Sequence, residues 1–326
     1  MAEPHVDFHP TVEETAERIA AMDVRGAAAI ADEAALALRK QAEASDATDP
    51  GTFRAELRGA ARRLRDTRPT AVSLPNALRY VFRGMGGETV EQLRESAIAS
   101  VEEFRAELDQ AQAKLGRIGA NRLRDGDTVM FHCHSTDALS CVDAALDQGK
   151  EIEAIVKETR PRKQGHITAR QLREWGVPVT LIVDSGARRY LDDADHVLVG
   201  ADSIAADGSV INKVGTSGLA VNARERGVPI MVAAQTIKLH PDTMTGHTVE
   251  IEMRDRREVL PDDEREEISA LDDDGLTVEN PAFDVTPPRY IDAIVTERGQ
   301  YPPESVVVLI RELFGEHTGT EPWEEA

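Results

Sequence analysis

The sequence predicts an α/β fold in which an N-terminal helical domain precedes a mostly parallel sheet. Up to about residue 118, apolar residues recur at three- and four-residue spacing, and no strand pattern interrupts them. From Asp125 on, short apolar runs alternate with helical segments, which indicates βαβ units. A chain of 326 residues can bury a sizeable core in one or two domains. We therefore expect a helical domain over residues 1–120 and a sheet domain over residues 121–326.

The helical domain is predicted from a periodic apolar pattern that begins near residue 12. Gly84-Met85-Gly86-Gly87 interrupts this pattern, and a long helix from about Val90 to Leu115 is expected to follow. The residues that define the apolar face include Ile19, Ala20, Ala29, Ile30, Ala35, Leu36 and Leu38.

The sheet domain is predicted to be Rossmann-like, because helical segments separate its short apolar runs. Residues 255–275 contain Pro-Asp-Asp-Glu and Asp-Asp-Asp, which predicts a solvated acidic insertion rather than a metal site. The expected strands are Thr128–His132, Glu153–Val156, Val179–Val183, Val197–Val199, Ile230–Ala233, Ala293–Val295 and Val306–Ile310.

The composition excludes several classes of protein. A formal net charge of -21 disfavours nucleic acid as a partner, and excess acid with few lysines is typical of adaptation to high salt. No run approaches the roughly 20 apolar residues of a membrane span, and the first ten residues lack a secretory signal, so we expect a cytoplasmic protein without a membrane partner. Two cysteines, Cys133 and Cys141, argue against a disulfide scaffold.

Cys133 and Asp202 are the candidate catalytic residues. Each follows an apolar run at the expected carboxyl end of a strand, which is where ligands bind in such sheets. A thiol and a carboxyl group on one sheet edge could form a proton-transfer pair. Taken alone, however, Cys133 is typical of a small buried core residue, and Asp202 at a sheet edge requires a partner.

Several turns in the sheet domain suggest that the ligand carries phosphate. Good N-cap residues, Ser135, Thr136 and Asp137, follow Cys133, and Gly215-Thr216-Ser217-Gly218 precedes another helix. Backbone amides at such helix starts bind anions, although every strand-to-helix turn needs a cap. The glycine spacing fits neither a dinucleotide nor a P-loop fingerprint, so we expect no cofactor. The candidate ligand-binding residues of this domain are Ser135, Thr136, Asp137, Asn212, Lys213 and Lys238.

The N-terminal half adds two candidate phosphate sites. Arg25-Gly26-Ala27-Ala28 lies at a helix start, and Arg68 precedes Pro69-Thr70 at a helix end. Arginine can hold phosphate with two parallel hydrogen bonds, but an arginine at a helix end is more often a solvated surface residue. His132 and His134 share a strand face and could suggest a metal, yet no further Cys/His cluster completes a site, so we expect no metal.

Five motifs in order give the chain a family resemblance. Together they resemble the superfamily of translation initiation factor 2B α/β/δ subunits and sugar-phosphate isomerases. The last motif is long and rare, which makes the resemblance specific. The motifs are Glu158-Thr159-Arg160-Pro161, Val179 to Asp184, Val199-Gly200-Ala201-Asp202, Asn212-Lys213-Val214-Gly215-Thr216, and Asn280-Pro281-Ala282-Phe283-Asp284-Val285-Thr286-Pro287-Pro288.

Within that superfamily three branches are distinguished by a few residues. The regulatory subunits typically lack the catalytic Cys and Asp, whereas this chain has both Cys133 and Asp202. Methylthioribose-1-phosphate isomerases usually carry Asn-Thr-Gly after the cysteine, where this chain has His134-Ser135-Thr136, and generally lack the lysine found here at Lys238. The combination resembles the archaeal ribose 1,5-bisphosphate isomerases, and the acidity suggests a haloarchaeal member.

The resemblance implies a reaction and an assembly. Asp202, kept protonated by an apolar setting, would protonate the ring oxygen of ribose 1,5-bisphosphate, and Cys133 as thiolate would remove the proton at carbon 2, its pKa lowered by the helix start near Ser135. A hydride shift remains an alternative. The resemblance also implies a homohexamer built as a trimer of dimers, with a nucleoside monophosphate as allosteric activator. The substrate-binding residues that it implies are Arg25, Gly26, Ala27, Ala28, Arg68, Ser135, Thr136, Asp137, Asn212, Lys213 and Lys238.

Overall fold

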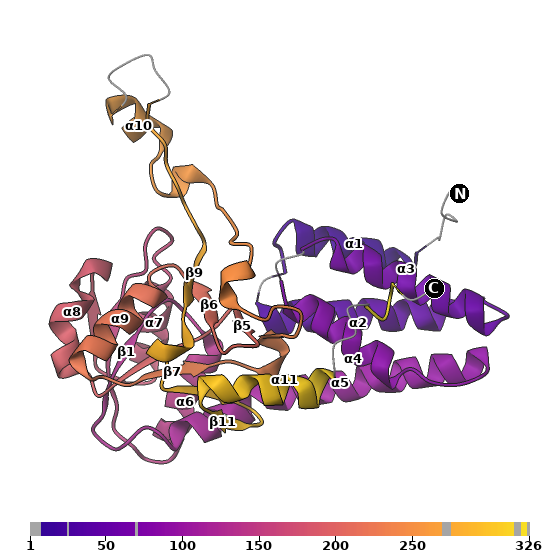
Figure 1. The fold of residues 1–326 in the computed structure, drawn as a ribbon, viewed down its shortest axis with the longest axis horizontal. Coiled ribbons are helices and arrows are strands. Elements are labelled where there is room, and N and C mark those ends of the chain that lie inside the picture. The colour runs from indigo at the N-terminus through magenta and orange to yellow at the C-terminus, as the bar shows by residue number, and fades with distance from the viewer. Residues whose placement is uncertain (1–7, 25, 69–70, 269–274, 316–320, 325–326) are drawn as a thin grey trace. The chain divides into compact units, whose positions relative to one another are not determined.

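The chain folds into two compact units, which are described separately (Figure 1). The computed structural model describes residues 8–24, 26–68, 71–268, 275–315 and 321–324. The helical unit consists of residues up to Ala111, together with Ile237–Asp242 and the described residues from Phe314 on; the sheet unit consists of Gln112–Thr236 and Thr243–Leu313. The division therefore differs from the expected single boundary near residue 120, because two later segments return to the helices.

The helical unit is built on an alanine-rich core. Residues such as Leu38, Phe53 and Leu74 are at most 1% exposed and pack between the helices. Asp49 starts one of these helices by accepting the Thr52 N–H at 2.9 Å, with proline in the next position. The helices are α1 (Pro10–Ala20), α2 (Ala27–Ala44), α3 (Pro50–Arg65), α4 (Ser73–Gly84) and the part of α5 (Val90–Ala120) up to Ala111.

Two segments distant in sequence complete the helical unit. The amide of Asn76 on α4 donates to the carbonyls of Ile237 and Leu239 at 2.8 and 2.7 Å. These residues lie in η3 (Thr236–Lys238) and β8 (Leu239–His240). Trp323, fully buried, packs into the same apolar core. No sequence pattern announces these long-range contacts.

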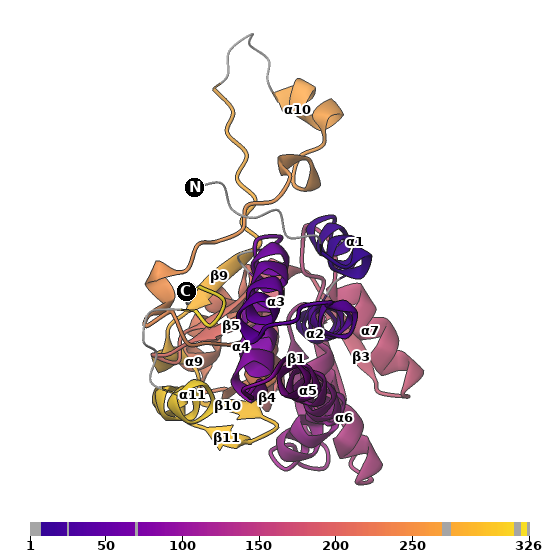
Figure 2. The same cartoon turned by 90° about the vertical axis from the view of Figure 1, so that its right-hand side faces the viewer.

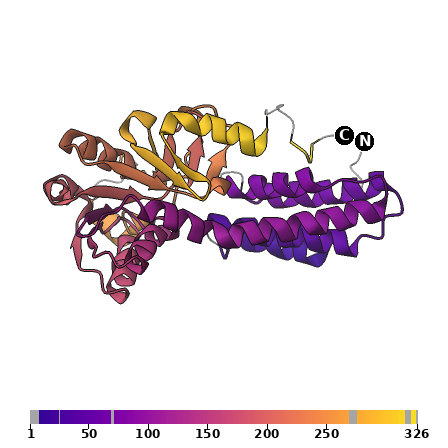
Figure 3. The same cartoon turned by 90° about the horizontal axis from the view of Figure 1, so that it is seen from below.

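The main sheet has seven strands, in the order β11-β10-β7-β4-β1-β2-β3, and all pairs are parallel except β10 with β11. Helices α6 and α7 cover one face, and α9 and α11 cover the other (Figures 2 and 3). The sequence predicts such a Rossmann-like, mostly parallel sheet. The strands are β1 (Thr128–Phe131), β2 (Glu153–Lys157), β3 (Val179–Ile182), β4 (His196–Val199), β7 (Ile230–Ala233), β10 (Ala293–Thr296) and β11 (Gly299–Tyr301).

The sheet unit also contains a small antiparallel sheet, whose strands the sequence did not predict. It pairs β5 (Ser203–Ala205) with β6 (Val210–Lys213), and β6 with β9 (Phe283–Thr286). The remaining helices are α6 (Thr136–Asp147), α7 (Gly165–Glu174), α8 (Ala187–Tyr190), α9 (Thr216–Arg226), α10 (Asp262–Ile268) and α11 (Val306–Phe314), and the short turns are η1 (Asp184–Gly186), η2 (Leu191–Asp193), η4 (Gly246–Thr248), η5 (Arg256–Glu258), η6 (Pro288–Tyr290) and η7 (Pro303–Ser305).

The expected strand Val306–Ile310 is wrong, because this segment begins helix α11. Val306, Leu309 and Ile310 are buried while Val308 is 55% exposed, which is helical and not strand periodicity. The acidic insertion also contains a short helix, α10, which stands away from the sheet in Figure 1. Within the described residues, no helix is long and apolar enough to cross a membrane.

Candidate active site

The Cys133 and Asp202 motifs meet at the carboxyl edge of the main sheet. They follow β1 and β4, which are parallel neighbours. Gly200 allows the two loops to approach closely, since a Cβ at this position would lie 2.3 Å from Oγ of Ser135. Electrostatic interaction between the Cys133 thiol and the Asp202 carboxyl group agrees with this proximity. The sequence prediction that both residues belong to one sheet edge is therefore supported by the fold.

The thiol of Cys133 is buried and protonated at neutral pH. Burial raises the pKa of Cys133 to about 11, and the charge of Asp202 also raises it. A hydrogen bond from the His134 backbone N–H and the charge of Lys213 act in the opposite direction but do not outweigh burial. The expected thiolate, with its pKa lowered by the start of α6, is therefore wrong for the protein without substrate. Cys133 and Cys141 are both free thiols.

Asp202 does not lie in the apolar setting that the sequence interpretation required. Its side chain is exposed, and its backbone N–H donates to the carbonyl of Ile211 at 2.9 Å. The residue stands at the junction between β4 and β5, so the small antiparallel sheet fixes its position.

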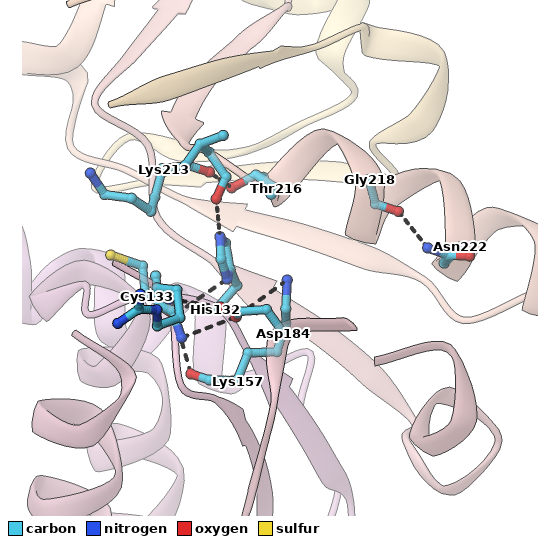
Figure 4. Close-up of polar contacts among 12 residues, drawn as sticks. His132, Cys133, Lys157, Asp184, Lys213, Thr216, Gly218 and Asn222 are labelled. Atoms are coloured by element: carbon cyan, nitrogen blue, oxygen red, sulfur yellow. Dashed lines mark hydrogen bonds and ion pairs between the residues drawn. The ribbon is translucent and has the colours of Figure 1, made fainter. Parts of the chain in front are cut away.

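Lys213 brings a cationic group to the thiol. Its Nζ donates to the Ala282 carbonyl at 3.0 Å and lies 4.8 Å from the centre of the Phe283 ring. Burial lowers the pKa of Lys213, while the charges of Cys133 and Asp202 raise it. Figure 4 shows the ammonium of Lys213 and the sulfur of Cys133 directed to the same side of the site. Asn212 is also buried and donates from Nδ2 to Oγ1 of Thr216 at 3.0 Å.

Arg254 is a second cation at this place, and sequence reasoning missed it. Its backbone N–H donates to the Asn280 carbonyl at 2.9 Å, beside the isolated bridge between Met253 and Pro281. Its side chain is 14% exposed, pairs with Glu252 at 3.4 Å and contributes to the electrostatics of both Cys133 and Lys213. The Nε atom is buried and makes no hydrogen bond within the described structure. No strand-like pattern marks this pairing in the sequence.

The turn Gly215–Gly218 is not an open anion site, contrary to expectation. The carboxylate of Asp284 on β9 accepts the Gly215 N–H at 2.7 Å and the Ser217 N–H at 3.1 Å. The N-terminus of α9 is therefore capped by the chain itself, and a phosphate there would meet a negative charge.

The other helix start, at α6, is also partly occupied. Ser135 is its N-cap and accepts the Ala138 N–H at 3.2 Å. Asp137 is 1% exposed and accepts hydrogen bonds from the side-chain amide of Gln235 at 2.8 Å and its backbone N–H at 3.3 Å. Asp137 thus connects α6 to the loop after β7. Ser135 and Thr136, the first helical residue, remain candidates.

The remaining candidates belong to the helical unit. Gly26, with a φ of 90°, is the N-cap of α2 without a side-chain cap, and Ala27 and Ala28 begin the helix. Arg68 follows the end of α3, and Lys238 ends η3. Arg25 lies outside the described residues.

His132 and His134 serve the loop around Cys133. His132 Nε2 lies 2.9 Å from the Val214 carbonyl, which places the ring proton on Nε2, and burial lowers the pKa of His132 to about 4 (Figure 4). His134 Nδ1 lies 3.1 Å from Oγ1 of Thr168. Because β1 ends at Phe131, neither histidine is in a strand. Within the described residues, no group of three His, Cys, Asp or Glu side chains could hold a metal ion.

Comparison with known proteins places these features in context. The sequence profile of the Initiation factor 2 subunit family matches residues 23–303. A protein of Haloterrigena turkmenica named ribose 1,5-bisphosphate isomerase is 74% identical over 98% of this chain and 98% of its own length. A protein of Thermococcus kodakarensis with the same name is 50% identical over 96% of this chain and 98% of its own. The crystal structure of translation initiation factor eIF-2B from Pyrococcus horikoshii matches with a TM-score of 0.75 and 28% identity, covering 92% of this chain and 100% of that chain.

Proposed function

The chain belongs to the Initiation factor 2 subunit family, and we propose that within this family it is an isomerase that converts α-D-ribose 1,5-bisphosphate to D-ribulose 1,5-bisphosphate. The observation that carries the proposal is the juxtaposition of Cys133, Asp202 and Lys213 at one sheet edge, in a chain that is 74% identical to a protein of that name. The acidic composition fits a haloarchaeal member of the family.

The reaction requires four proton transfers, which Cys133 and Asp202 can carry out between them. Phosphate on the anomeric oxygen prevents spontaneous ring opening, so an acid must protonate the ring oxygen as its bond to carbon 1 breaks. A base removes the proton from carbon 2, which gives an enediol-like intermediate. The thiol then gives a proton to carbon 1 while the hydroxyl proton on carbon 2 goes back to the acid. We assign the acid to Asp202 and the base to Cys133.

We propose that Cys133 and Asp202 share a single proton, and that the active form carries it on Asp202. Without substrate, Cys133 holds the proton and its pKa is about 11. Transfer of this proton to the neighbouring Asp202 carboxylate creates the thiolate and the carboxylic acid in one step. Two groups that exchange one proton titrate as a pair. The active form is therefore reached without loss of a proton to solvent.

In the sheet unit, side-chain cations are proposed to hold phosphate. Lys213 is a buried cation and Arg254 a partly buried one near the thiol, and the buried Nε of Arg254 has no hydrogen-bond partner. We assign one phosphate to this pair, with Asn212, Ser135 and Thr136 contributing. By the family resemblance we propose Arg25, Gly26, Ala27, Ala28, Arg68 and Lys238 as further substrate-binding residues.

The wider setting follows from the family resemblance. We propose a homohexamer built as a trimer of dimers, activation by a nucleoside monophosphate, and a place in the degradation of nucleoside monophosphates. Two free thiols and a phosphorylated substrate favour the cytoplasm. Light scattering at high salt tests the assembly.

The activity is tested with purified protein in high salt and α-ribose 1,5-bisphosphate, followed by phosphorus NMR with and without nucleoside monophosphates. Cys133→Ala and Asp202→Asn are each expected to lower turnover by about a hundredfold or more, and Cys141→Ala, at the other cysteine, to leave it unchanged. Absence of conversion under all conditions would refute the isomerase. Preferential conversion of methylthioribose 1-phosphate would replace the substrate, and tight binding to initiation factor 2 without catalysis would indicate a regulatory subunit.

Deuterated solvent separates proton transfer from a hydride shift. Proton transfer through Cys133 predicts deuterium at carbon 1 of the product, because the thiol exchanges with solvent. A hydride shift moves hydrogen directly from carbon 2 and predicts no solvent deuterium there.

A further inference from the structure

The backbone of Cys133 leaves the sheet just before it delivers the thiol. The register between β1 and β2 ends with Phe131 opposite Val156. Cys133 then adopts a φ of 68°, in the left-handed region that side chains other than glycine seldom occupy. Such a conformation persists only where surrounding contacts enforce it. The N–H and C=O of Cys133 also need new partners, since the sheet no longer supplies them.

Two buried threonine hydroxyls are the hydrogen-bond partners of the Cys133 N–H and C=O groups. The Cys133 N–H donates to Oγ1 of Thr159 at 2.8 Å, and Oγ1 of Thr168 donates to the Cys133 carbonyl at 2.9 Å. Both threonines are 1% exposed. Thr159 follows β2 and Thr168 lies on α7, so two separate elements hold one residue from both sides.

The Thr159 hydroxyl is itself oriented. Its proton has two acceptors, the Lys157 carbonyl at 3.1 Å and Nδ1 of His132 at 3.4 Å, and with either one a lone pair is left for the Cys133 N–H. Thr159 also has a positive φ, 63°, and its N–H donates to Oδ1 of Asp184 at 3.0 Å. The Arg160 N–H donates to the other oxygen of the same carboxylate at 2.7 Å. Asp184 and the buried Lys157 lie together beside this turn in Figure 4.

The Thr168 hydroxyl is oriented by a different partner. Because its proton goes to the Cys133 carbonyl, its oxygen accepts from Nδ1 of His134, 3.1 Å away. The hydrogen-bond chain from His134 through Thr168 returns to Cys133, so the residue after the thiol helps to fix the thiol's own peptide.

We propose that Thr159 and Thr168 are positioning residues that hold Cys133 in its left-handed conformation and thereby direct the thiol at the substrate. The inference rests on the proposed function for its catalytic consequence, but the conformation it describes is independent of the substrate. Valine has nearly the shape of threonine without the hydroxyl, whereas serine keeps the hydroxyl. The two replacements therefore separate hydrogen bonding from packing.

The test compares Thr159→Val, Thr159→Ser, Thr168→Val and Thr168→Ser. Thr296→Val is the matched control, because Thr296 is fully buried in the same unit and its hydroxyl bonds the Gly299 carbonyl at 3.2 Å. The valine variants at Thr159 and Thr168 are expected to lower kcat by about a hundredfold with KM nearly unchanged, and the serine variants to recover most of it. The control is expected to lose stability in urea without loss of kcat.

Alkylation of Cys133 by iodoacetamide, in a Cys141→Ala background and without substrate, provides the second measurement. Release of the loop exposes the thiol, so both valine variants are expected to react at least about tenfold faster at fixed pH, with serine restoring the slow rate. An effect on KM alone, failure of serine to rescue, or an equal loss of kcat in the control overturns the proposal. If the wild-type protein converts no substrate, the proposed function fails, and an unchanged alkylation rate in the valine variants then overturns the positioning role separately.

Discussion

The shared proton between Cys133 and Asp202 makes a specific prediction about pH. With a thiol pKa of about 11, only about one molecule in 10⁴ carries the thiolate near pH 7 if the proton must go to solvent. That population costs about 5 kcal/mol, or about four powers of ten in rate. A reaction that used only this fraction would accelerate about tenfold for each unit of pH up to the thiol pKa.

Transfer of the proton to Asp202 removes this dependence. The total charge of the pair is then the same in the resting and active forms, so kcat is expected to stay constant within about twofold from about pH 7 to about pH 9. In Asp202→Asn the internal acceptor is lost. The residual kcat of this variant is expected to rise about tenfold per pH unit, because its thiol must lose the proton to solvent. The plateau should lie below about pH 11, since Asp202 no longer raises the thiol pKa.

The assay measures initial rates at saturating substrate and constant high salt, by phosphorus NMR. Asp192→Asn is the control, since it removes a carboxylate that is 60% exposed on the surface of the same unit. Its profile should match that of the wild type. A wild-type rate that climbs tenfold per pH unit would refute the shared proton, and a flat profile in Asp202→Asn would show that Asp202 is not the acceptor.

Four further substitutions test the structure by urea unfolding. Gly200→Ala places a Cβ 2.3 Å from the N-cap oxygen of α6 and is expected to lower the free energy of unfolding by about 1–3 kcal/mol. Gly218→Ala, where the added Cβ meets open space, should leave the free energy of unfolding unchanged or raise it slightly. Equal effects of the two substitutions would contradict the close approach at Gly200. Asp284→Ala removes the cap of α9 and is expected to cost about 0.5–2 kcal/mol without improving phosphate affinity. Asn76→Ala leaves two backbone carbonyls of the helical unit without their donor, and a loss below about 1 kcal/mol would contradict the contacts.

The sequence was sufficient to predict where the two candidate catalytic residues lie in the sheet. Cys133 and Asp202 could be assigned to one sheet edge because each ends an apolar run, and parallel strands bring such ends together. Burial could not be predicted in the same way. The thiol pKa depends on which side chains enclose it, so the sequence indicated a thiolate at a helix start where burial gives a neutral thiol. Asp202, expected in an apolar setting, is exposed.

Contacts between distant segments account for the other differences. Arg254 reaches the site through a short pairing with Asn280 across the acidic insertion, and neither segment has strand periodicity. The segment from Val306 was misread because a short apolar run does not distinguish a strand from a buried helix. The carboxylate of Asp284, from another part of the chain, accepts the Gly215 N–H at the start of α9. A glycine-rich turn before a helix was therefore not enough to identify an anion site.

Several carboxylates of the chain accept hydrogen bonds from backbone amides, and this reduces the number of places where a phosphate can bind. At the carboxyl edge of the sheet, Asp184 accepts the amides after β2, Asp284 those that start α9, and Glu297 the Thr236 N–H at 3.0 Å. An anion at any of these places would have to displace a residue of the chain and face its charge. These amides are therefore not open to an anion, which favours side-chain cations as the phosphate ligands of the sheet unit. Lys213 is buried, Arg254 is 14% exposed, and both act on the electrostatics of the Cys133 thiol, so the phosphate proposed for this pair would lie beside the group proposed as the base.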